Sequence, residues 1–480
     1  MKCPTQPTAI PVTALLLACL VLALGGLSST ARGDAIDDYL QRELATRQIP
    51  GLALAVVRHG IVERISAYGL ANIETGTPVT ADSIFAIASL DKGITASGVM
   101  KAMEQGKLDV ADPITKYVDV PLPSVTLGML LSHTSGLPDM DQVLAEQYGA
   151  HPFQHYATDE LLAAVRNARP IGAPGTRYYY SDAGLFLAQL ATQKAEGRPW
   201  FAWMQQTLFR PAGMHNVVTL HPTAIIPHRV APYTFDAGQH LIRDGRTEVD
   251  YDLMYNDIGM TVGDFARWLS MLDGRGPLSA ASVKRLWMPV TLADGLPTRE
   301  VFAFSGYGMG FGLDDVLGEP VILHTGHSGV AYVKFPRLDL AVVVFTNLEH
   351  PMGSDPAGLA LGVAGLLEPR VSLAALSAGS AHEPVAAQGL RHDYELFVAG
   401  TPDLAHYAAR LRDTVWLNRD TFSGRLPRLG GLVAWQFLRE APVDSEQSLL
   451  FRATHAHGVV YARFSLDPAG LVTRLVWWHL

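Results

Sequence analysis

The sequence predicts a mixed α/β fold in which helices flank one antiparallel sheet, followed by a small α+β domain. Two strand hairpins stand at opposite ends of one long region. Leu52 to Val57 pairs with Ile61 to Tyr68, and Val330 to Phe335 pairs with Leu340 to Phe345. Helical patterns fill the residues between the hairpins. We therefore expect strands from both ends to meet in a single sheet, with an all-helical subdomain between them.

The chain is expected to divide into a large domain, residues 34–370, and a small domain, residues 389–480. Ala357 to Leu367 is an apolar helix near the end of the large domain. Residues 371–388 are rich in Ala, Ser and Gly, which is typical of a linker. The small domain contains an amphipathic helix pattern at Pro402 to Leu417. Strand patterns follow it at Leu432 to Leu438, Leu449 to Thr454, Val459 to Ser465 and Leu471 to Trp478.

The composition is that of a folded protein with no general affinity for nucleic acid. Of its 480 residues, 48% are hydrophobic and 17% are charged, which is too apolar for a disordered chain. The formal net charge of -9 supplies no basic field for a phosphate backbone. Nucleic acid is therefore not an expected partner.

The first 31 residues are typical of a secretory signal peptide. Lys2 precedes the apolar run Val12 to Leu27, and Ser29 to Ala31 offers small residues for cleavage. A membrane anchor is the alternative, but the run is shorter than the roughly 20 residues of a spanning helix. We expect a bacterial periplasmic or secreted protein with no membrane span after cleavage. Both cysteines, Cys3 and Cys19, lie in this segment, so the mature chain lacks disulfides; lipidation at Cys19 is a further alternative.

The first candidate catalytic pair is Ser89 and Lys92, at the start of a helical pattern. Residues three apart on a helix are neighbours, so the hydroxyl and the amine are expected side by side. Desolvation and the positive helix end both disfavour an ammonium, so a buried lysine here can serve as the base that activates the serine. In isolation, an N-capping serine beside a surface lysine is the simpler explanation.

The second candidate segment contains Tyr180, Ser181 and Asp182, just before a helical run. A loop tyrosine can transfer protons if its oxygen faces the serine and the lysine. The alternative is a set of aromatic residues at the core edge, followed by Asp182 as an N-cap.

The third candidate segment, His324 to Gly329, immediately precedes the second hairpin. Gly326 would let a substrate backbone approach a strand, while His324 and Thr325 can meet a carboxylate or a developing charge. A tight turn with exposed histidines is the alternative. A two-histidine metal site is a further option, but it lacks an evident third ligand. No G-x-S-x-G nucleophile elbow, H-E-x-x-H motif or Walker loop is present.

In this order and spacing, the three segments resemble the penicillin-recognising serine hydrolases. The branch is that of class C β-lactamases, D-alanyl-D-alanine carboxypeptidases and related esterases. Flanking phrases agree, at Phe85 to Ala88, Leu130 to Leu137, Gly306 to Gly310 and Val342 to Asn347. The resemblance covers about residues 36 to 370. It implies the β-lactamase/transpeptidase-like fold for this region and requires no metal or organic cofactor.

The resemblance also implies roles for the matched residues. Ser89 would be the acylated nucleophile, Lys92 its base, and Tyr180 the proton shuttle to the leaving group. The backbone N–H groups of Ser89 and His327 would form an oxyanion hole. His324, Thr325 and Gly326 occupy the third motif, where many lactamases have Lys-Thr-Gly and some carboxypeptidases have His-Thr-Gly. His133, in the Leu130 to Leu137 phrase, is assigned a packing and turn role.

Two residues depart from the family pattern. Asp182 stands where the family usually has Asn, and Asp91 replaces the usual Thr or similar residue before the lysine. A carboxylate near Lys92 favours the ammonium and opposes its use as a base. Tyr180 would then take more of the base role, or turnover is slow, or Asp182 points away from the lysine.

The sequence therefore favours an exported serine hydrolase that forms an acyl-enzyme with a small peptide, amide or ester. His324 favours a carboxypeptidase-like or esterase activity over efficient β-lactam hydrolysis. The alternative is a catalytically silent binding protein that retains the pocket, which the carboxylates at Asp91 and Asp182 allow. The sequence leaves open the substrate, the oligomeric state and the role of the small domain.

Overall fold

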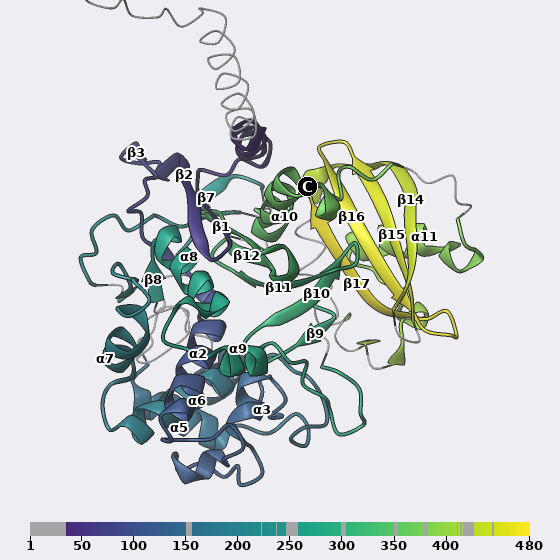
Figure 1. Cartoon of the computed structure of the whole chain (residues 1–480). Coiled ribbons are helices and arrows are strands. Elements are labelled where there is room, and N and C mark those ends of the chain that lie inside the picture. Colours follow the sequence, from purple (N-terminus) through teal and green to yellow (C-terminus); the bar gives the residue numbers. More distant parts are fainter. Residues whose placement is uncertain are drawn as a thin grey trace, which may run out of the picture.

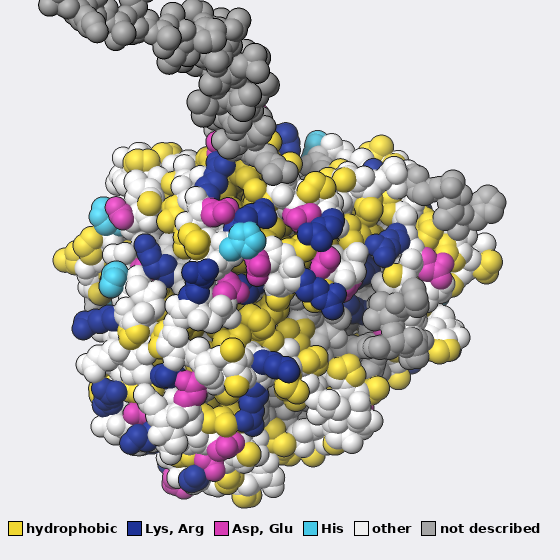
Figure 2. Space-filling view, in the orientation of Figure 1, with side chains coloured by type: hydrophobic (Ala, Val, Ile, Leu, Met, Phe, Trp, Pro, Cys, Tyr) yellow, Lys and Arg dark blue, Asp and Glu magenta, His cyan; other side chains and the backbone are white. Residues whose placement is uncertain are grey.

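The structure is a computed structural model that describes residues 35–149, 156–221, 223–236, 238–245, 258–298, 304–349, 354–377, 383–409, 411–412, 415, 427–443 and 446–480. The expected signal peptide, residues 1–31, lies outside these ranges. Within them, no helix has the length and apolar character needed to span a membrane. On the face shown in Figure 2, basic and acidic side chains are interspersed.

An eight-stranded antiparallel sheet forms the centre of the large region, in the order β3-β2-β1-β13-β12-β11-β10-β9. Strands β1 and β13, which are nearly 300 residues apart in the chain, lie side by side, with Leu54 opposite Val344. The sequence prediction that both ends contribute to one sheet is confirmed. The strands span Gly51–Arg58 (β1), Ile61–Asn72 (β2), Thr77–Pro78 (β3), Gly306–Tyr307 (β9), Gly312–Val316 (β10), Glu319–Gly326 (β11), Val330–Phe335 (β12) and Leu340–Thr346 (β13).

Both faces of this sheet are covered, because alternate residues of a strand point to opposite sides. Along β13, Ala341 and Val343 belong to one apolar cluster, while Val342 and Val344 belong to the other. Helix α8 (Val262–Ser270) packs with the first cluster and helix α10 (Pro356–Leu367) with the second. Every residue of β13 is buried, as its continuous apolar sequence indicates.

A group of helices lies at one end of the sheet, and helix α2 (Asp91–Glu104) is at its centre (Figure 1). Every residue from Asp91 to Met100 is buried. Small residues permit this, since a Cβ at Gly93 would meet the Trp268 ring at 2.7 Å and one at Gly98 the Met204 sulfur at 2.6 Å. The start of α2 is therefore held rigidly.

Helices α6 (Asp182–Glu196) and α9 (Ala280–Leu286) pack against α2. Further helices of the large region are α3 (Leu127–Leu131), α4 (Met140–Tyr148), α5 (Thr158–Asn167) and α7 (Trp200–Met204). Two small sheets complete the region: β4 (Phe85–Ala86), β8 (Ile258–Met260) and β5 (Val218–Thr219) form one, and β6 (Tyr233–Phe235) and β7 (Leu241–Arg243) the other.

The C-terminal region contains a four-stranded antiparallel sheet, β14 (Leu432–Val443), β15 (Glu446–His455), β16 (Gly458–Leu466) and β17 (Val472–His479), in chain order. The expected strands are present, and β14 and β15 extend well beyond their expected bounds. Figure 1 shows this sheet in yellow beside α10. Together the two regions form the β-lactamase/transpeptidase-like fold with a small C-terminal domain, as the sequence predicted.

The helix expected at Pro402 to Leu417 is wrong in its first part. Leu404–His406 is a single 3₁₀ turn after Asp403, whose side chain accepts from the Ala405 N–H. Tyr407 then pairs with β17 as an isolated bridge at Val472. Strand pairing thus replaces helix before residue 409, and the described residues from 409 to 415 are helical. Helix α11 (Leu390–Val398), which the sequence analysis did not predict, packs on the C-terminal sheet.

Candidate active site

The hydroxyl of Ser89 lies beside the amine of Lys92, with 3.0 Å between Ser89 Oγ and Lys92 Nζ. Ser89 stands in a 3₁₀ turn, Ala88–Leu90, that leads directly into α2. This turn places the two side chains about one helical turn apart. The lysine is completely buried. The surface-lysine alternative is therefore wrong for Lys92.

The turn that carries Ser89 has an unusual backbone. Ala88 has a φ of 45°, in the left-handed region that costs a residue with a Cβ roughly 1 kcal/mol or more. Strand β11 approaches the same turn closely: a Cβ at Gly326 would meet the Ile87 carbonyl oxygen at 2.8 Å and the Ala88 Cβ at 3.1 Å. The glycine of the third segment thus allows this strand to pass directly beside the candidate nucleophile.

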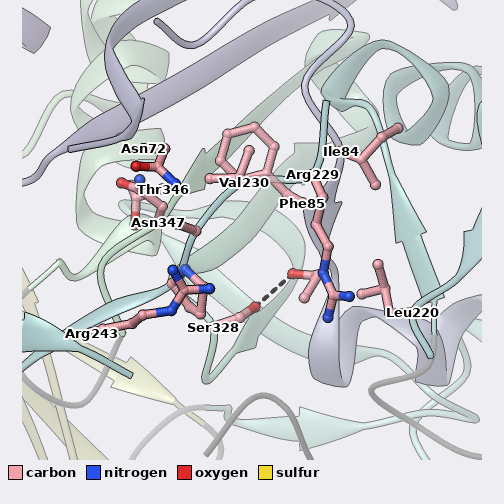
Figure 3. A pocket seen from close by; sticks show the side chains of 13 residues that line it. Asn72, Ile84, Phe85, Leu220, Arg229, Val230, Arg243, Ser328, Thr346 and Asn347 are labelled. Atoms are coloured by element: carbon pink, nitrogen blue, oxygen red, sulfur yellow. Dashed lines mark hydrogen bonds between the residues drawn. The ribbon is translucent and has the colours of Figure 1, made fainter. Parts of the chain in front are cut away.

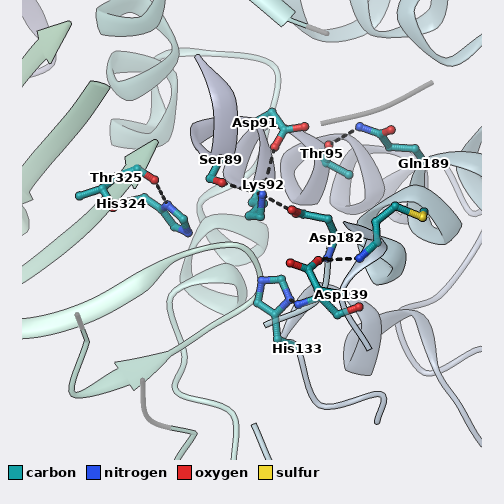
Figure 4. A network of polar contacts seen from close by, with 12 residues as sticks. Ser89, Asp91, Lys92, Thr95, His133, Asp139, Asp182, Gln189, His324 and Thr325 are labelled. Carbon is teal, nitrogen blue, oxygen red and sulfur yellow. Dashed lines mark hydrogen bonds and ion pairs between the residues drawn. The ribbon is translucent and has the colours of Figure 1, made fainter. Parts of the chain in front are cut away.

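Two buried carboxylates surround the lysine (Figure 4). Asp182 Oδ1 lies 2.7 Å from Lys92 Nζ, and Asp91 Oδ1 lies 3.8 Å from it. Burial alone lowers the pKa of Lys92, but the charges of Asp182 and Asp91 outweigh burial, so the pKa is raised. Burial raises the pKa of Asp91 to about 7 and also raises that of Asp182, in both cases against the opposing effect of Lys92. The structure therefore excludes the possibility that Asp182 points away from Lys92.

Tyr180 also lies close to the lysine. The centroid of its ring is 5.0 Å from Lys92 Nζ. The ring also stacks on the imidazole of His133, with 4.4 Å between centroids and an interplanar angle of 28°. Asp182 is not the N-cap of α6, since Ser181 takes that position and Asp182 is the first residue of the helix. The start of α6 thus presents Tyr180 and Asp182 to the same amine.

His133 contacts the loop that carries Tyr180 and Ser181. The Ser181 N–H donates to its Nδ1 at 3.1 Å, so the imidazole carries its proton on Nε2. Burial, followed by Lys92 and His324, lowers the pKa of His133 well below its usual range, so the ring is neutral. The backbone of His133 is left-handed, with a φ of 56°. Through these contacts His133 positions the Tyr180 ring and the Ser181 backbone.

The third segment faces the serine from β11. His324 is buried, and its Nε2 lies 3.1 Å from the hydroxyl of Tyr307. Burial, followed by the charge of Lys92, lowers the pKa of His324 to about 3, so this imidazole is also neutral. Thr325 is partly exposed and Gly326 is buried. The alternative of a turn with exposed histidines is therefore wrong for His324.

The turn after β11 is fastened to the segment before the serine. Ser328 Oγ donates to the Ala86 carbonyl at 2.7 Å, which brings the backbone next to His327 close to the start of the Ser89 turn. Among the described residues, no group of three His, Cys, Asp or Glu side chains could hold a metal ion. The hydroxyl of Ser89 and the amine of Lys92, 3.0 Å apart, suit nucleophilic and acid–base chemistry.

Two residues of this network were not singled out from the sequence. Tyr307 contacts His324, and it appeared only in a phrase of the family pattern. Asp139 accepts the Asp182 N–H at 2.8 Å, and burial followed by the charge of Asp182 raises its pKa to about 7. A signal for Asp139 was present, because Asp before an apolar helical run is a typical N-cap, and it does cap α4.

Comparison with known proteins agrees with the fold described above, which is that of β-lactamase-related serine hydrolases. The chain belongs to the Beta-lactamase family, whose family model matches residues 36–365.

Among similar proteins, Esterase EstB of Burkholderia gladioli is 27% identical over 402 residues, which cover 73% of this chain and 98% of the esterase. A D-aminopeptidase of Gluconobacter oxydans is 25% identical over 378 residues, which cover 76% of this chain and 67% of that protein. These relatives act on different bonds, so membership of the family does not by itself fix the substrate.

Among solved structures, an octameric penicillin-binding protein homologue from Pyrococcus abyssi aligns with a TM-score of 0.61 and 17% identity, over 90% of this chain and 96% of that one. D-alanine carboxypeptidase AmpC from Burkholderia cenocepacia aligns with a TM-score of 0.55 and 21% identity, over 70% of this chain and 99% of its own. At these identities the two structures establish a common fold alone.

Proposed function

We propose that this protein is an exported serine hydrolase that forms an acyl-enzyme at Ser89 with a small peptide, amide or ester. The observation that carries the proposal is the 3.0 Å contact between Ser89 Oγ and the Nζ of a fully buried Lys92. A serine hydroxyl is a weak nucleophile unless a base accepts its proton, and this contact supplies a candidate base within hydrogen-bond reach.

In the proposed reaction, the Ser89 hydroxyl loses its proton and its oxygen bonds to the substrate carbonyl carbon. The backbone N–H groups of Ser89 and His327 would stabilise the negative oxygen that develops, each contributing roughly 3 kcal/mol. The proton then passes to the leaving group as its bond to carbon breaks. Water repeats the sequence on the acyl-enzyme and releases the acid.

The state of Lys92 decides which group accepts the serine proton. Asp182 and Asp91 raise the pKa of the lysine and so favour its ammonium form. An ammonium donates to Ser89 Oγ and cannot take its proton. In that state Tyr180, whose ring lies 5.0 Å from Lys92 Nζ, is the remaining candidate base. Lys92 and Tyr180 thus form a pair of candidate bases. The two carboxylates determine which of them accepts the serine proton.

Labelling of Ser89 tests this proposal. A fluorophosphonate probe should add one covalent label to the wild type, detected as a mass increase of the intact protein, and Ser89→Ala should abolish it. Ser97→Ala is the matched control, because Ser97 lies in α2, directly after the turn of Ser89, but donates to the Gly93 carbonyl. A label that persists in Ser89→Ala would refute the assignment.

A silent binding protein is the second candidate, and the charged lysine favours it. Asp182 at 2.7 Å stabilises a form of Lys92 that cannot act as a base. This protein would bind D-amino-acid peptides or penicillins without ever forming an acyl-enzyme. Binding in calorimetry without any covalent label would support it over the hydrolase.

The substrate class is proposed from the third segment and from the relatives. A neutral His324 in place of a lysine removes one positive charge from the pocket. This supports esterase or carboxypeptidase-like activity, in line with the named activities of the esterase and the D-aminopeptidase relatives. Export is proposed from the signal-like residues 1–31.

A further inference from the structure

Asp182, the first residue of helix α6, makes two polar contacts at the active site. Its carboxylate lies 2.7 Å from Lys92 Nζ, and its backbone N–H donates to Oδ1 of Asp139 at 2.8 Å (Figure 4). Because one residue makes both contacts, the backbone bond fixes the point from which the carboxylate extends. A change at Asp139 therefore acts on the distance between that carboxylate and the lysine.

Helix α6 does not cap its own first turn. Ser181 is its N-cap, but the serine side chain makes no cap hydrogen bond and instead donates to the Pro138 carbonyl at 2.7 Å. The first N–H groups of a helix have no partner within the helix and need one from elsewhere. Asp139 supplies that partner for the Asp182 N–H. The start of α6 is thus fastened by the preceding segment.

A single oxygen of Asp139 serves two helices. Its Oδ1 accepts the Met140 N–H at the start of α4 at 2.8 Å, as well as the Asp182 N–H at the start of α6. Carboxylate oxygens form strong hydrogen bonds with backbone N–H groups at helix starts. Two such donors converge here, so Asp139 joins α4 and α6 at their first residues.

The other side of the contact, the Ser89–Lys92 pair, is fixed independently of α6. Lys92 is completely buried within α2. The segment before Ser89 is held by Ser328, whose hydroxyl donates to the Ala86 carbonyl at 2.7 Å (Figure 3). The distance between Lys92 and Asp182 therefore depends on where α6 begins.

The charges that act on Lys92 come from several elements. Burial lowers its pKa, but Asp182 of α6 and Asp91 of α2 outweigh burial, and Tyr307 of β9 adds to their effect. The two imidazoles described above are neutral. Asp182 makes the shorter of the two carboxylate contacts, so its position has the larger influence on the proton of the lysine.

The charges that act on Asp139 are those of Asp182 and of Asp141 on α4. Burial and then these two carboxylates raise the pKa of Asp139 to about 7. Asp182 lies between Asp139 and Lys92, since its backbone contacts the first and its carboxylate the second. Asp182 is thus the group through which Asp139 acts on the lysine.

We propose that Asp139 is a positioning residue that holds the Asp182 carboxylate against Lys92 and so keeps the lysine in its ammonium form. The inference rests on the proposed hydrolase function, because it concerns a candidate base of that reaction. It predicts that the reach of the side chain at position 139 matters more than its charge.

Two substitutions at Asp139 separate reach from charge. Asp139→Asn removes the charge but keeps an oxygen at the same distance from the backbone. Asp139→Ser also removes the charge and remains a good N-cap for α4, but its oxygen is one atom closer to the backbone and loses the Asp182 N–H. The measurement is the rate of fluorophosphonate labelling at Ser89 against pH in the full chain, with circular dichroism to confirm folding.

In Asp139→Ser, the acid limb of this profile should move down by about one pH unit, as expected when a carboxylate moves away from an amine. Asp139→Asn should keep the limb of the wild type. In an Asp182→Asn background, Asp139→Ser should cause no further shift, because the charge that it positions is already gone. Ser279→Ala is the matched control, since Ser279 caps α9, which also packs against α2, and this variant should keep the limb of the wild type.

The outcomes distinguish this inference from the proposed function. An unchanged limb in Asp139→Ser, equal shifts in Asp139→Ser and Asp139→Asn, or a further shift in the Asp182→Asn background would each overturn the positioning role alone, because Ser89 is still labelled. A wild type that takes no label at Ser89 would refute the hydrolase function, and the inference with it.

Discussion

At the scale of the residue, the protonation of Lys92 is a balance between burial and two carboxylates. Burial disfavours an ammonium, while Asp182 at 2.7 Å and Asp91 at 3.8 Å favour it, and the carboxylates prevail. The sequence indicated this conflict, because Asp182 stands where the related enzymes usually have Asn. The structure excludes one of the open alternatives, that Asp182 points away from Lys92. The motif alone could not do so, because it does not determine the direction of a side chain.

Asp182→Asn should leave turnover equal or higher and shift the acid limb of the pH–rate profile to lower pH. The physical reason is that removing the carboxylate removes a charge that raises the pKa of Lys92, so the neutral amine persists to lower pH. The measurement is kcat/KM against pH with a chromogenic ester. Asp159→Asn is the control, because Asp159 is an exposed residue in the first turn of α5. A large loss of activity in Asp182→Asn would show that the carboxylate is itself required.

The site residues that the sequence predicted are those within short motifs. Ser89 and Lys92 are three residues apart, so helical geometry alone brings them together. Tyr307 and Asp139 could not be found in this way. Their contacts, to His324 and to the N–H of Asp182, join segments that only the folded sheet and helices bring together.

At the scale of the element, the strands were predictable where side-chain pattern and turn chemistry agreed. β12 and β13 are mostly apolar and buried throughout, and they are joined by Pro336–Leu338, so both signals placed the hairpin correctly. The segment after Pro402 had a helical stripe, yet Tyr407 pairs with β17. Pairing with a strand more than 60 residues away in the chain replaced the helix that the local pattern predicted. Local propensity carries no information about such a distant partner.

Gly326→Ala should lower kcat/KM roughly 100-fold while the protein remains folded. The new methyl group would meet the Ile87 carbonyl oxygen at 2.8 Å, so β11 must move away from the turn that carries Ser89. A displacement of about 1 Å at a reacting group can cost this much in rate. The measurement is ester hydrolysis together with circular dichroism.

Gly431→Ala is the control for that variant, because a Cβ there meets no atom within 4 Å and the residue has no positive φ. Activity of Gly326→Ala equal to that of Gly431→Ala would show that the close approach of β11 has no catalytic importance.

At the scale of the whole molecule, a buried ion cluster joins the C-terminal sheet to the large region. Asp314 of β10 accepts from Arg463 of β16 at 2.6 Å and from Arg474 of β17 at 2.7 Å. Apolar residues of both regions belong to the same cluster, among them Leu359 of α10 and Trp478 of β17. The small sheet is thus packed as part of the molecule rather than tethered beside it. The sequence could not predict this, since neither arginine lies in a recognisable motif.

Asp314→Asn should destabilise the protein by roughly 3 kcal/mol, because it leaves two arginines buried without their carboxylate. Burial opposes ionisation of Asp314, but Arg463 and Arg474 outweigh it and lower its pKa from 3.8 to about 2. A carboxyl group whose pKa is lower in the folded state stabilises above the unfolded value. This contribution is therefore complete above about pH 4 and is lost as the pH falls towards 2.

Urea unfolding from pH 7 to pH 2 should show that loss in the wild type and a smaller one in Asp314→Asn. Asp315→Asn, whose side chain accepts only from the nearby Gly318 N–H among the bonds described, should follow the wild type. Equal pH dependence in all three proteins would mean that the cluster does not hold the two regions together.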